Sequence, residues 1–184
     1  ISVGRVRNVK RFFLIAEMLQ FVTLPIKWTH VGDIAENDPT RERFLESIKA
    51  LDRNKNVRIE LLGHMENGLL LEYYKSNFID VLINSSEIEG LPVSIQEAIS
   101  FGIPCLATDV GGTADIVNAS TGVLLPHDFN PVDAASVLSD FLKSKSRDIE
   151  FRKGVRDFWF ANFQAEINYP SFFATLSAQG KFEG

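Results

Sequence analysis

The sequence of 184 residues is poor in residues that build disulfides or metal sites, with one cysteine, Cys105, and three histidines. A single thiol excludes an internal disulfide framework and a zinc site made of several cysteines, and it fits a reducing compartment. The scattered histidines and the absence of a clustered aspartate pair give no reason to expect a bound metal. We expect no metal and no cofactor, and we expect Cys105 to be a buried, inert residue of the core.

Long hydrophobic runs and an excess of positive charge are also missing. No apolar run approaches the roughly 20 residues that cross a bilayer, and no signal peptide opens the chain. Arg and Lys number 19 against 24 Asp and Glu, which gives a net charge of −5. A domain that reads nucleic acid usually has a basic excess, so nucleic acid is not an expected partner. The chain lacks a Gly-x-Gly-x-x-Gly motif, which disfavours a dinucleotide-dependent reductase.

What is present is globular composition, with 45% hydrophobic and 23% charged residues. Short apolar runs alternate with amphipathic segments, and this alternation predicts an α/β fold with a Rossmann-like, doubly wound parallel sheet of about six strands and C-terminal helices. Expected strands are 1–4, 26–31, 57–62, 79–83, 104–107 and 122–125. Expected helices are 9–21, 39–51 with Asp38 as N-cap, 67–74, 92–101 and 131–142 with Asn130 as N-cap.

The last part of the chain differs from the rest. Residues 148–177 contain no strand pattern, and aromatic residues crowd the segment 151–163. We expect residues 1–145 to form the Rossmann-like domain and residues 146–184 to form a helical segment. That segment packs either on this domain or on a domain that is missing. Because the chain begins with isoleucine, we expect it to be a piece of a longer protein.

The most informative stretch follows the strand predicted at 79–83. A loop carries Glu89 and Gly90, and a helix is predicted to start at Pro92, with Glu97 inside it. A glycine lets backbone N–H groups approach a ligand closely, and a helix N-terminus suits a phosphate. Two carboxylates beside such a helix start suit the hydroxyls of a sugar nucleotide. Spacing alone leaves open that Glu89 is an ordinary loop acid and Glu97 a solvated helix residue.

Glu89 and Glu97, with seven residues between them, resemble the Glu-x7-Glu motif of the GT-B glycosyltransferases, in particular the retaining family called family 4 or group 1. The residues around them are also similar to the family's motifs. Its Ser-x-x-Glu-Gly-Leu-Pro pattern is matched by residues 86–92, and its Glu-Ala-x-x-x-Gly-x-Pro pattern by residues 97–104. Residues 108–112 resemble its Thr-Asp-Val-Gly-Gly segment, and residues 121–124 its Thr-Gly-x-Leu strand.

Upstream, Gly4 and Arg5 followed by Lys10 resemble the family's Gly-Arg-x4-Lys. The resemblance implies that Arg5 and Lys10 hold the donor diphosphate, and a guanidinium and an ammonium can neutralise that charge. It implies that Glu89 contacts the transferred sugar and Glu97 the ribose. Leu62-Gly63-His64 resembles a loop that meets the nucleobase, so His64 is expected there. Gly90, Leu91 and Pro92 would help to bind the phosphates or the sugar.

The sequence departs from the family's pattern at three places. Arg11 stands where the family often has glycine, and Ser85 where it often has proline. Residues 32–38 replace a tighter Gly-x-Gly-Pro turn. None of these departures touches the paired glutamates. The longer loop could change which base or acceptor is admitted.

The resemblance, which covers about residues 2–141, implies the C-terminal, donor-binding domain of a glycosyltransferase that moves a hexose from a nucleotide sugar to an acceptor hydroxyl with retention. The expected partners are the nucleotide sugar, an N-terminal GT-B domain and an unidentified acceptor. We expect a cytoplasmic enzyme, with any peripheral contact to the inner face of the membrane made through the missing domain. The alternatives are a non-catalytic nucleotide-sugar-binding or assembly module and a sugar-nucleotide epimerase, which the motifs from 86 to 104 disfavour.

Overall fold

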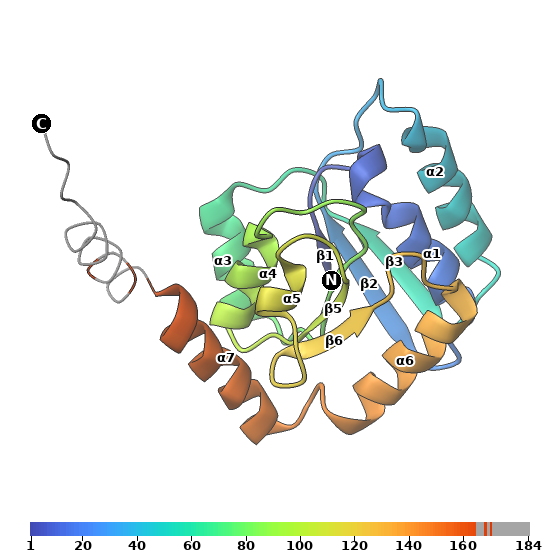
Figure 1. The fold of residues 1–184 in the computed structure, drawn as a ribbon. Coiled ribbons are helices and arrows are strands. Elements are labelled where there is room, and N and C mark those ends of the chain that lie inside the picture. The colour runs from blue at the N-terminus through green and yellow to red at the C-terminus, as the bar shows by residue number, and fades with distance from the viewer. Residues whose placement is uncertain (165–167, 169, 171–184) are drawn as a thin grey trace, which may run out of the picture.

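The computed structural model describes residues 1–164, 168 and 170, and in these residues short strands and helices alternate along the chain (Figure 1). The strands are β1 (Ser2–Val3), β2 (Ile26–Val31), β3 (Val57–Leu61), β4 (Leu82–Asn84), β5 (Cys105–Thr108) and β6 (Gly122–Leu125). The helices are α1 (Phe12–Leu19), α2 (Thr40–Leu51), α3 (Asn67–Ser76), α4 (Val93–Ser100), α5 (Thr113–Ile116), α6 (Pro131–Ser144) and α7 (Ile149–Phe163). A 3-10 turn, η1 (Asn8–Lys10), precedes α1.

The strands form two parallel sheets, in the orders β1-β2-β3 and β4-β5-β6. The sheets meet where the Ile1 amino group donates to Val81 O at 2.9 Å and Ile83 N donates to Ile1 O at 2.8 Å. This alternation is the hydrogen-bond pattern of parallel strands, so the strands run in the order β3-β2-β1-β4-β5-β6. That order is typical of doubly wound α/β folds. The predicted fold class is confirmed, with the strands divided between two three-stranded sheets.

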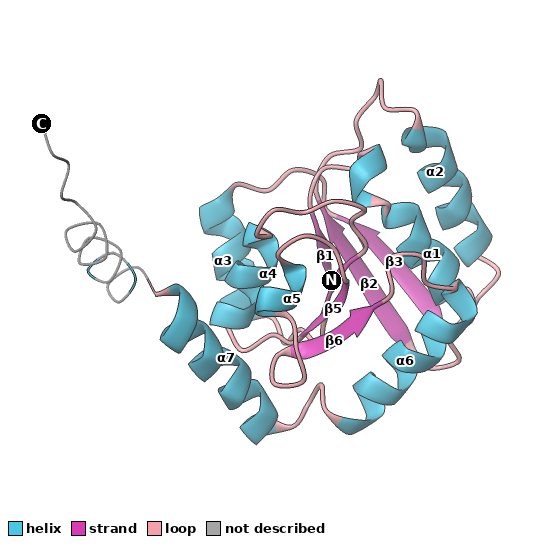
Figure 2. Ribbon diagram, in the orientation of Figure 1, coloured by secondary structure: helices cyan, strands magenta, loops and turns pink. Residues whose placement is uncertain are grey.

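Helices cover both faces of the strands (Figures 1 and 2), as parallel sheets require. Helices α1, α2 and α6 lie on one face, and α3, α4, α5 and α7 lie on the other. The first core contains buried side chains that include Phe12, Ile15, Leu19, Trp28, Phe44 and Leu138. The second contains Leu82, Ile95, Ile99, Ile116 and Val155, together with Cys105, which is fully buried as predicted.

The prediction of one continuous helix over residues 9–21 is wrong, because the segment contains the turn η1 and the helix α1. Arg11 has φ 46° and ψ 35°, in the left-handed region, and separates η1 from α1. A single left-handed residue cannot continue a right-handed helix, so the chain turns there. The helix predicted from Pro39 begins one residue later, at Thr40. The N-cap is Pro39, not Asp38 as predicted, although the Asp38 carboxylate accepts a hydrogen bond from Thr40 N at 2.9 Å.

Helix α7 packs closely on α4. Its N-cap is Asp148, whose carboxylate accepts from Phe151 N at 2.8 Å, and Val155 is fully buried. A Cβ on Gly102, two residues after α4 ends, would lie 2.7 Å from Arg152 O, so the two backbones approach closely. The aromatic residues of the sequence after 170 lie outside the described residues.

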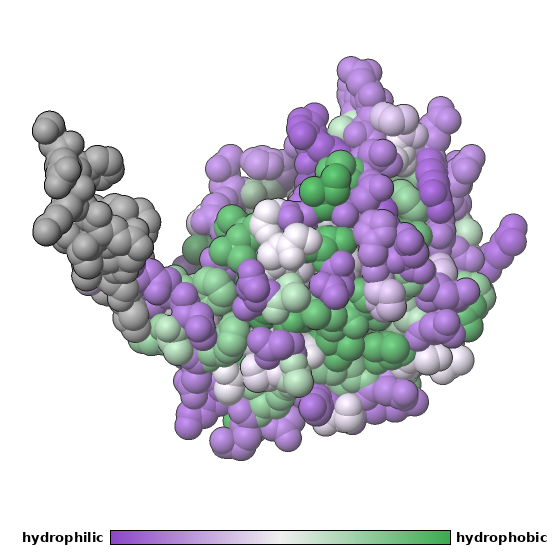
Figure 3. All heavy atoms as spheres, in the orientation of Figure 1, coloured by the Kyte–Doolittle hydropathy of each residue, from purple (hydrophilic) through white to green (hydrophobic). Residues whose placement is uncertain are grey.

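Polar side chains cover α2, while apolar ones gather along the exposed edge at β6 between α5 and α6 (Figure 3). Val123 and Leu124 of β6 are only partly buried. Among the described residues, every helix is too short or too polar to span a lipid bilayer.

His30 is buried at the centre of the first core, as expected for a packing histidine. Its Nδ1 lies 2.9 Å from Ser2 Oγ, which accepts from Trp28 Nε1 at 3.0 Å and can therefore donate its own proton to the imidazole. His30 Nε2 has no partner among the described residues. Burial lowers the pKa of His30 from 6.5 to about 4, so the folded protein keeps the ring neutral.

The free energy of unfolding should therefore fall as the pH drops from about 6.5 to about 4. In that window the unfolded chain protonates His30 and the folded chain does not, and the shift corresponds to about 3 kcal/mol. Urea unfolding at pH 7.5 and pH 4.5 measures the loss. The variant His30→Gln should lose less stability than the parent between the two values. Equal losses in both proteins would contradict this assignment.

Candidate donor-binding site

The carboxyl ends of β1 and β4 lie next to each other, and the segments that follow them bring Lys10 and Glu89 into contact. Lys10 Nζ lies 2.6 Å from Glu89 Oε1. Lys10 ends η1, and Glu89 belongs to the loop between β4 and α4. In open parallel sheets this edge is where ligands bind. The structure thus joins two of the residues that the sequence predicted to act together.

Glu89 is held by a set of donors that all bind one oxygen. Besides Lys10, Asn84 Nδ2 donates to Glu89 Oε1 at 3.0 Å and Ser86 Oγ at 2.6 Å. Burial alone would raise the pKa of Glu89, but the hydrogen bonds from Lys10, Ser86 and Asn84 outweigh it and hold the pKa below its ordinary value. Oε2 accepts no hydrogen bond from any residue that the structure describes. Glu89 is therefore an ionised carboxylate that is fixed through Oε1, while Oε2 keeps its hydrogen-bonding capacity among the described residues.

The loop that carries Glu89 and Gly90 is braced by the loop after β5. Gly112 N donates to Gly90 O at 2.8 Å. Gly111 has φ +51°, and a Cβ on it would lie 1.8 Å from Glu89 O. Only a residue without a side chain permits this approach, which explains the glycine pair at this point.

Helix α4 begins beside this loop. Its N-cap is Pro92, which is buried and has no side chain that could cap the helix. The first N–H groups of α4, at the positive end of the helix dipole, therefore remain free for a ligand. Leu91, one residue earlier, is exposed. The predicted helix start is confirmed to within one residue.

Glu97 and His64 lie on neighbouring elements. Glu97, inside α4, accepts a hydrogen bond from Asn67 Nδ2 at 2.6 Å, and Asn67 is the first residue of α3. His64 is exposed in the loop before α3, where its backbone N–H donates to Asp33 at 3.1 Å and its Nε2 lies 3.1 Å from Glu66. No hydrogen bond or ion pair joins Glu97 or His64 to Lys10 or Glu89 among the described residues.

Arg5 follows β1 and is exposed. Together with Arg7 and residues 33–38 it lines an open hollow of about 550 Å³. Within residues 1–164, 168 and 170 it makes no hydrogen bond or ion pair. The structure thus puts Arg5 at the same edge of the sheet as Lys10 but not in contact with it.

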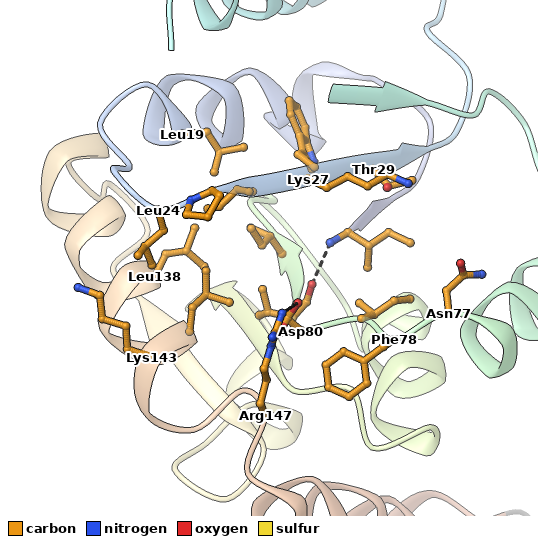
Figure 4. A pocket seen from close by; sticks show the side chains of 18 of the residues that line it. Leu19, Leu24, Lys27, Thr29, Asn77, Phe78, Asp80, Leu138, Lys143 and Arg147 are labelled. Carbon is orange, nitrogen blue, oxygen red and sulfur yellow. Dashed lines mark hydrogen bonds and ion pairs between the residues drawn. The ribbon is translucent and has the colours of Figure 1, made fainter. Parts of the chain in front are cut away.

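The larger cavity of about 610 Å³ lies at the opposite, amino ends of β2 and β4 (Figure 4). It is lined by apolar side chains such as Leu24 and Leu138, with Lys27 and the ion pair of Asp80 and Arg147. None of the predicted site residues lines this cavity. Among the described residues no group of three metal-ligating side chains could hold a metal ion.

Sequence reasoning missed the side chains that hold the acidic groups in place. Asn84 and Asn67 bind Glu89 and Glu97, but they lie 5 and 30 residues away in sequence and belong to no spacing rule. Ser86 was visible as the first residue of the motif 86–92, although its bond to Glu89 was not predicted. The sequence marks Arg11 and Ser85 only as departures from the family's pattern.

Comparison with known proteins identifies the family of the chain. The family model described as "Glycosyl transferases group 1" matches residues 1–158, and the chain belongs to this family. The lipopolysaccharide 1,6-galactosyltransferase of Escherichia coli (strain K12) is 31% identical over 97 residues, which is 51% of this chain and 26% of that protein. The probable sucrose-phosphate synthase 5 of Oryza sativa subsp. japonica is 40% identical over 80 residues, which is 42% of this chain and 8% of that protein.

Solved structures share the fold. Anabaena Alr3699/HepE in complex with UDP superimposes with a TM-score of 0.76 at 18% identity, over 96% of this chain and 48% of that one. The sucrose-phosphate synthase of Thermosynechococcus elongatus gives a TM-score of 0.74 at 21% identity, over 97% of this chain and 46% of that one. The chain therefore spans about half the length of these two proteins.

The close packing of Gly111 predicts that Gly111→Ala is costly. The added Cβ would meet Glu89 O, and alanine disfavours the positive φ, so we expect a loss of about 2 kcal/mol or more in the free energy of unfolding. Gly90→Ala is the matched control, because a Cβ there meets nothing within 4 Å. Urea unfolding measures both variants. Equal stability of the two would show that this backbone contact is not formed.

Proposed function

We propose that this chain is the donor-binding domain of a retaining glycosyltransferase that transfers a hexose from a nucleotide sugar to an acceptor hydroxyl. The observation that carries the proposal is the ion pair of Lys10 and Glu89 beside the uncapped start of α4. It combines a cation for phosphate, free helix N–H groups and a fixed carboxylate at the edge of the sheet where such folds bind ligands. Membership of the group 1 family supports the same reading.

The diphosphate of the donor is proposed to bind Lys10, the start of α4 and Arg5. Lys10 is shared with Glu89 in this structure, so an incoming phosphate would compete for its ammonium group or share it. Negative charge grows on the leaving diphosphate during transfer, and cations placed beforehand stabilise it. Arg5 is exposed and unengaged among the described residues, which leaves its guanidinium available for the same anion. Gly90, Leu91 and Pro92 would shape the turn around the phosphates.

The sugar and the nucleoside are proposed to bind at the two glutamates. Oε2 of Glu89, which accepts no hydrogen bond from the described residues, would accept from a sugar hydroxyl, while Oε1 stays occupied by its own donors. Glu97, oriented by Asn67, is assigned to the ribose hydroxyls. His64, in the loop before α3, is assigned to the nucleobase. These roles rest on the family resemblance together with the contacts described above.

The acceptor site, the donor sugar and the location of the enzyme are proposed from the similar proteins and from the composition of the chain. A complete enzyme would need an N-terminal domain that carries the acceptor site, and about half of HepE and of the sucrose-phosphate synthase lies outside the region matched here. Residues 1–145 would bind the donor, and the helical segment after them would brace it. The relatives include a galactosyltransferase and a probable sucrose-phosphate synthase, and HepE was solved with UDP, which supports a nucleotide hexose as donor. No metal or other cofactor is proposed, and the buried thiol of Cys105 fits a cytoplasmic location.

The proposed division of labour between two domains predicts that residues 1–184 alone bind nucleotide weakly and do not turn over. Closure of two lobes normally excludes water and completes such a site. Transfer from a nucleotide hexose, followed by nucleotide release, measures turnover with and without a supplied N-terminal domain. Retention is checked by the anomeric configuration of the first product. Multiple turnovers by the chain alone would contradict the division.

The proposed phosphate contacts predict that Lys10→Ala weakens nucleoside diphosphate binding by about 1–3 kcal/mol, and Arg5→Ala by an amount at the low end of that range. The difference follows from the exposure of Arg5, since water and salt screen exposed charges. Calorimetry with the nucleoside diphosphate and with the nucleoside separates the phosphate contribution. Arg7→Ala is the matched control, as Arg7 is exposed in the same loop. Equal weakening for nucleoside and diphosphate would show that these residues do not act on phosphate.

Substitutions of Glu89 and Glu97 should affect the binding of different ligands. Glu97→Gln should weaken both nucleoside diphosphate and nucleotide sugar, because both contain the ribose. Glu89→Gln should keep nucleoside diphosphate affinity within about 0.5 kcal/mol and lower transfer strongly in a two-domain enzyme. Calorimetry with both ligands, with melting curves as the folding control, makes the comparison. A folded Glu89→Gln protein without nucleoside diphosphate binding would overturn the assignment.

A further inference from the structure

Arg11 stands between the turn that carries Lys10 and helix α1, in a conformation that is uncommon for any residue but glycine. Its φ is 46°, and it is the non-glycine residue with positive φ in the described chain. A side chain in this region raises the energy of the backbone, so the arginine needs compensating contacts. Those contacts are made by its guanidinium group.

The guanidinium group binds backbone carbonyls from two separate loops. Nε donates to Ser85 O at 2.9 Å, and Nη2 donates to Ser86 O and to His127 O, each at 3.0 Å. Ser85 and Ser86 begin the loop that carries Glu89, and His127 follows β6. A guanidinium presents its donors in a fixed plane, so these three bonds set the relative positions of the loops.

Ser85 completes the arrangement from the other side. Its hydroxyl lies within hydrogen-bond distance of Lys10 O, at 2.9 Å, and of Arg11 O, at 3.1 Å. Arg11 and Ser85 are two of the three places where the sequence departs from the family's pattern, and here they bond to each other. The side chain of Arg11 bonds to the backbone of Ser85, and the side chain of Ser85 bonds to the backbone of Arg11.

The same bonds lead directly to the proposed site. Ser86, whose carbonyl binds Arg11, donates through its hydroxyl to Glu89 Oε1 at 2.6 Å. Glu87 N donates to Val9 O at 2.8 Å, which adds a backbone link between the same two segments. Lys10, the partner of Glu89, is the residue before Arg11. The bonds of Arg11 therefore fix the segments from which Lys10 and Glu89 both extend.

The guanidinium of Arg11 has carbonyl oxygens, not carboxylates, as its direct partners. It is partly buried, and burial lowers its pKa below the ordinary value although Glu87 and Asp128 nearby favour the charged form. An arginine keeps its proton in such a setting. A charged group that is bonded to three neutral carbonyls is suited to holding the backbone in place. A cation that binds an incoming anion would instead have its donors free.

We propose that Arg11 is a positioning residue of the donor site, which clamps the loops after β4 and β6 so that Lys10 and the start of α4 face the same diphosphate. The proposal rests on the proposed function, because it assigns Arg11 a role in donor binding. The competing explanation is that Arg11 contributes only positive charge near the phosphates. Lysine supplies that charge but cannot reach three carbonyls in one plane, so Arg11→Lys separates the two explanations.

The experiment compares the parent chain with Arg11→Lys, Arg11→Gly and Ser85→Ala. Two quantities are measured, the affinity for nucleoside diphosphate by calorimetry and the titration of the Glu89 carboxyl carbon by NMR, with melting temperature as the folding control. Arg147→Lys is the matched control, because Arg147 pairs with Asp80 at the opposite end of the sheet. Glycine accepts the positive φ, so Arg11→Gly removes the clamp without adding backbone strain.

We expect both Arg11 variants to bind nucleoside diphosphate about fivefold more weakly, the loss that one hydrogen bond represents. The Glu89 midpoint should move up toward its ordinary value in both, since the donors to Oε1 lose their fixed positions. Ser85→Ala should show a smaller change in the same direction, and Arg147→Lys none. Ser85→Ala decides the question if both Arg11 variants fail to fold.

Two results would overturn the proposal. One is an Arg11→Lys protein that matches the parent in both quantities, which would reduce the role to charge. The other is a Glu89 titration that stays unchanged in Arg11→Gly, which would show that the clamp does not act on the site. A parent chain that binds none of UDP, GDP and ADP would instead count against the proposed function, and the Glu89 titration would still decide the role of Arg11.

Discussion

The ion pair of Lys10 and Glu89 is the interaction on which the candidate site depends. It links the segment after β1 to the segment after β4, which are 79 residues apart in sequence. A partly buried carboxylate is stable only when its lost hydration is replaced, and here one lysine, one serine and one asparagine replace it. Asn84 ends β4 and Ser86 follows it, while Lys10 ends the turn η1 that comes after β1. Parallel strands therefore place the charges before any ligand arrives.

Backbone contacts supply the second half of the arrangement. The loop with Glu89 and Gly90 rests on Gly111 and Gly112, and this support fixes where α4 begins. Arg11 bonds the same loop from its other side. A loop held on both sides can present its carboxylate and the N-terminus of α4 in one geometry, which reduces the ordering that ligand binding would require.

Much of this could be predicted from sequence because it follows from local patterns. Alternating apolar runs predicted the parallel α/β fold, and the spacing of Glu89 and Glu97 within ordered motifs pointed to the edge of the sheet where both now lie. The left-handed turn at Arg11 could not be predicted, because arginine seldom adopts positive φ and its surroundings continue a helical pattern. The bond between Asn67 and Glu97 could not be predicted either, since it depends on how α3 and α4 are placed on the sheet. The predicted roles of Arg5, Lys10, His64, Glu89 and Glu97 remain predictions.

The central claim is that nucleotide binds at the carboxyl edge of the strands and not in the cavity at their amino ends. Amide chemical shifts of residues 1–184, followed by NMR while UDP, GDP or ADP is added, test it most directly. The account predicts that at least one nucleotide shifts the signals of Lys10 and of residues 86–93 most strongly. Shifts concentrated at residues 26–29 and 79–81, around the cavity of Figure 4, or no response to any of the three nucleotides, would contradict it.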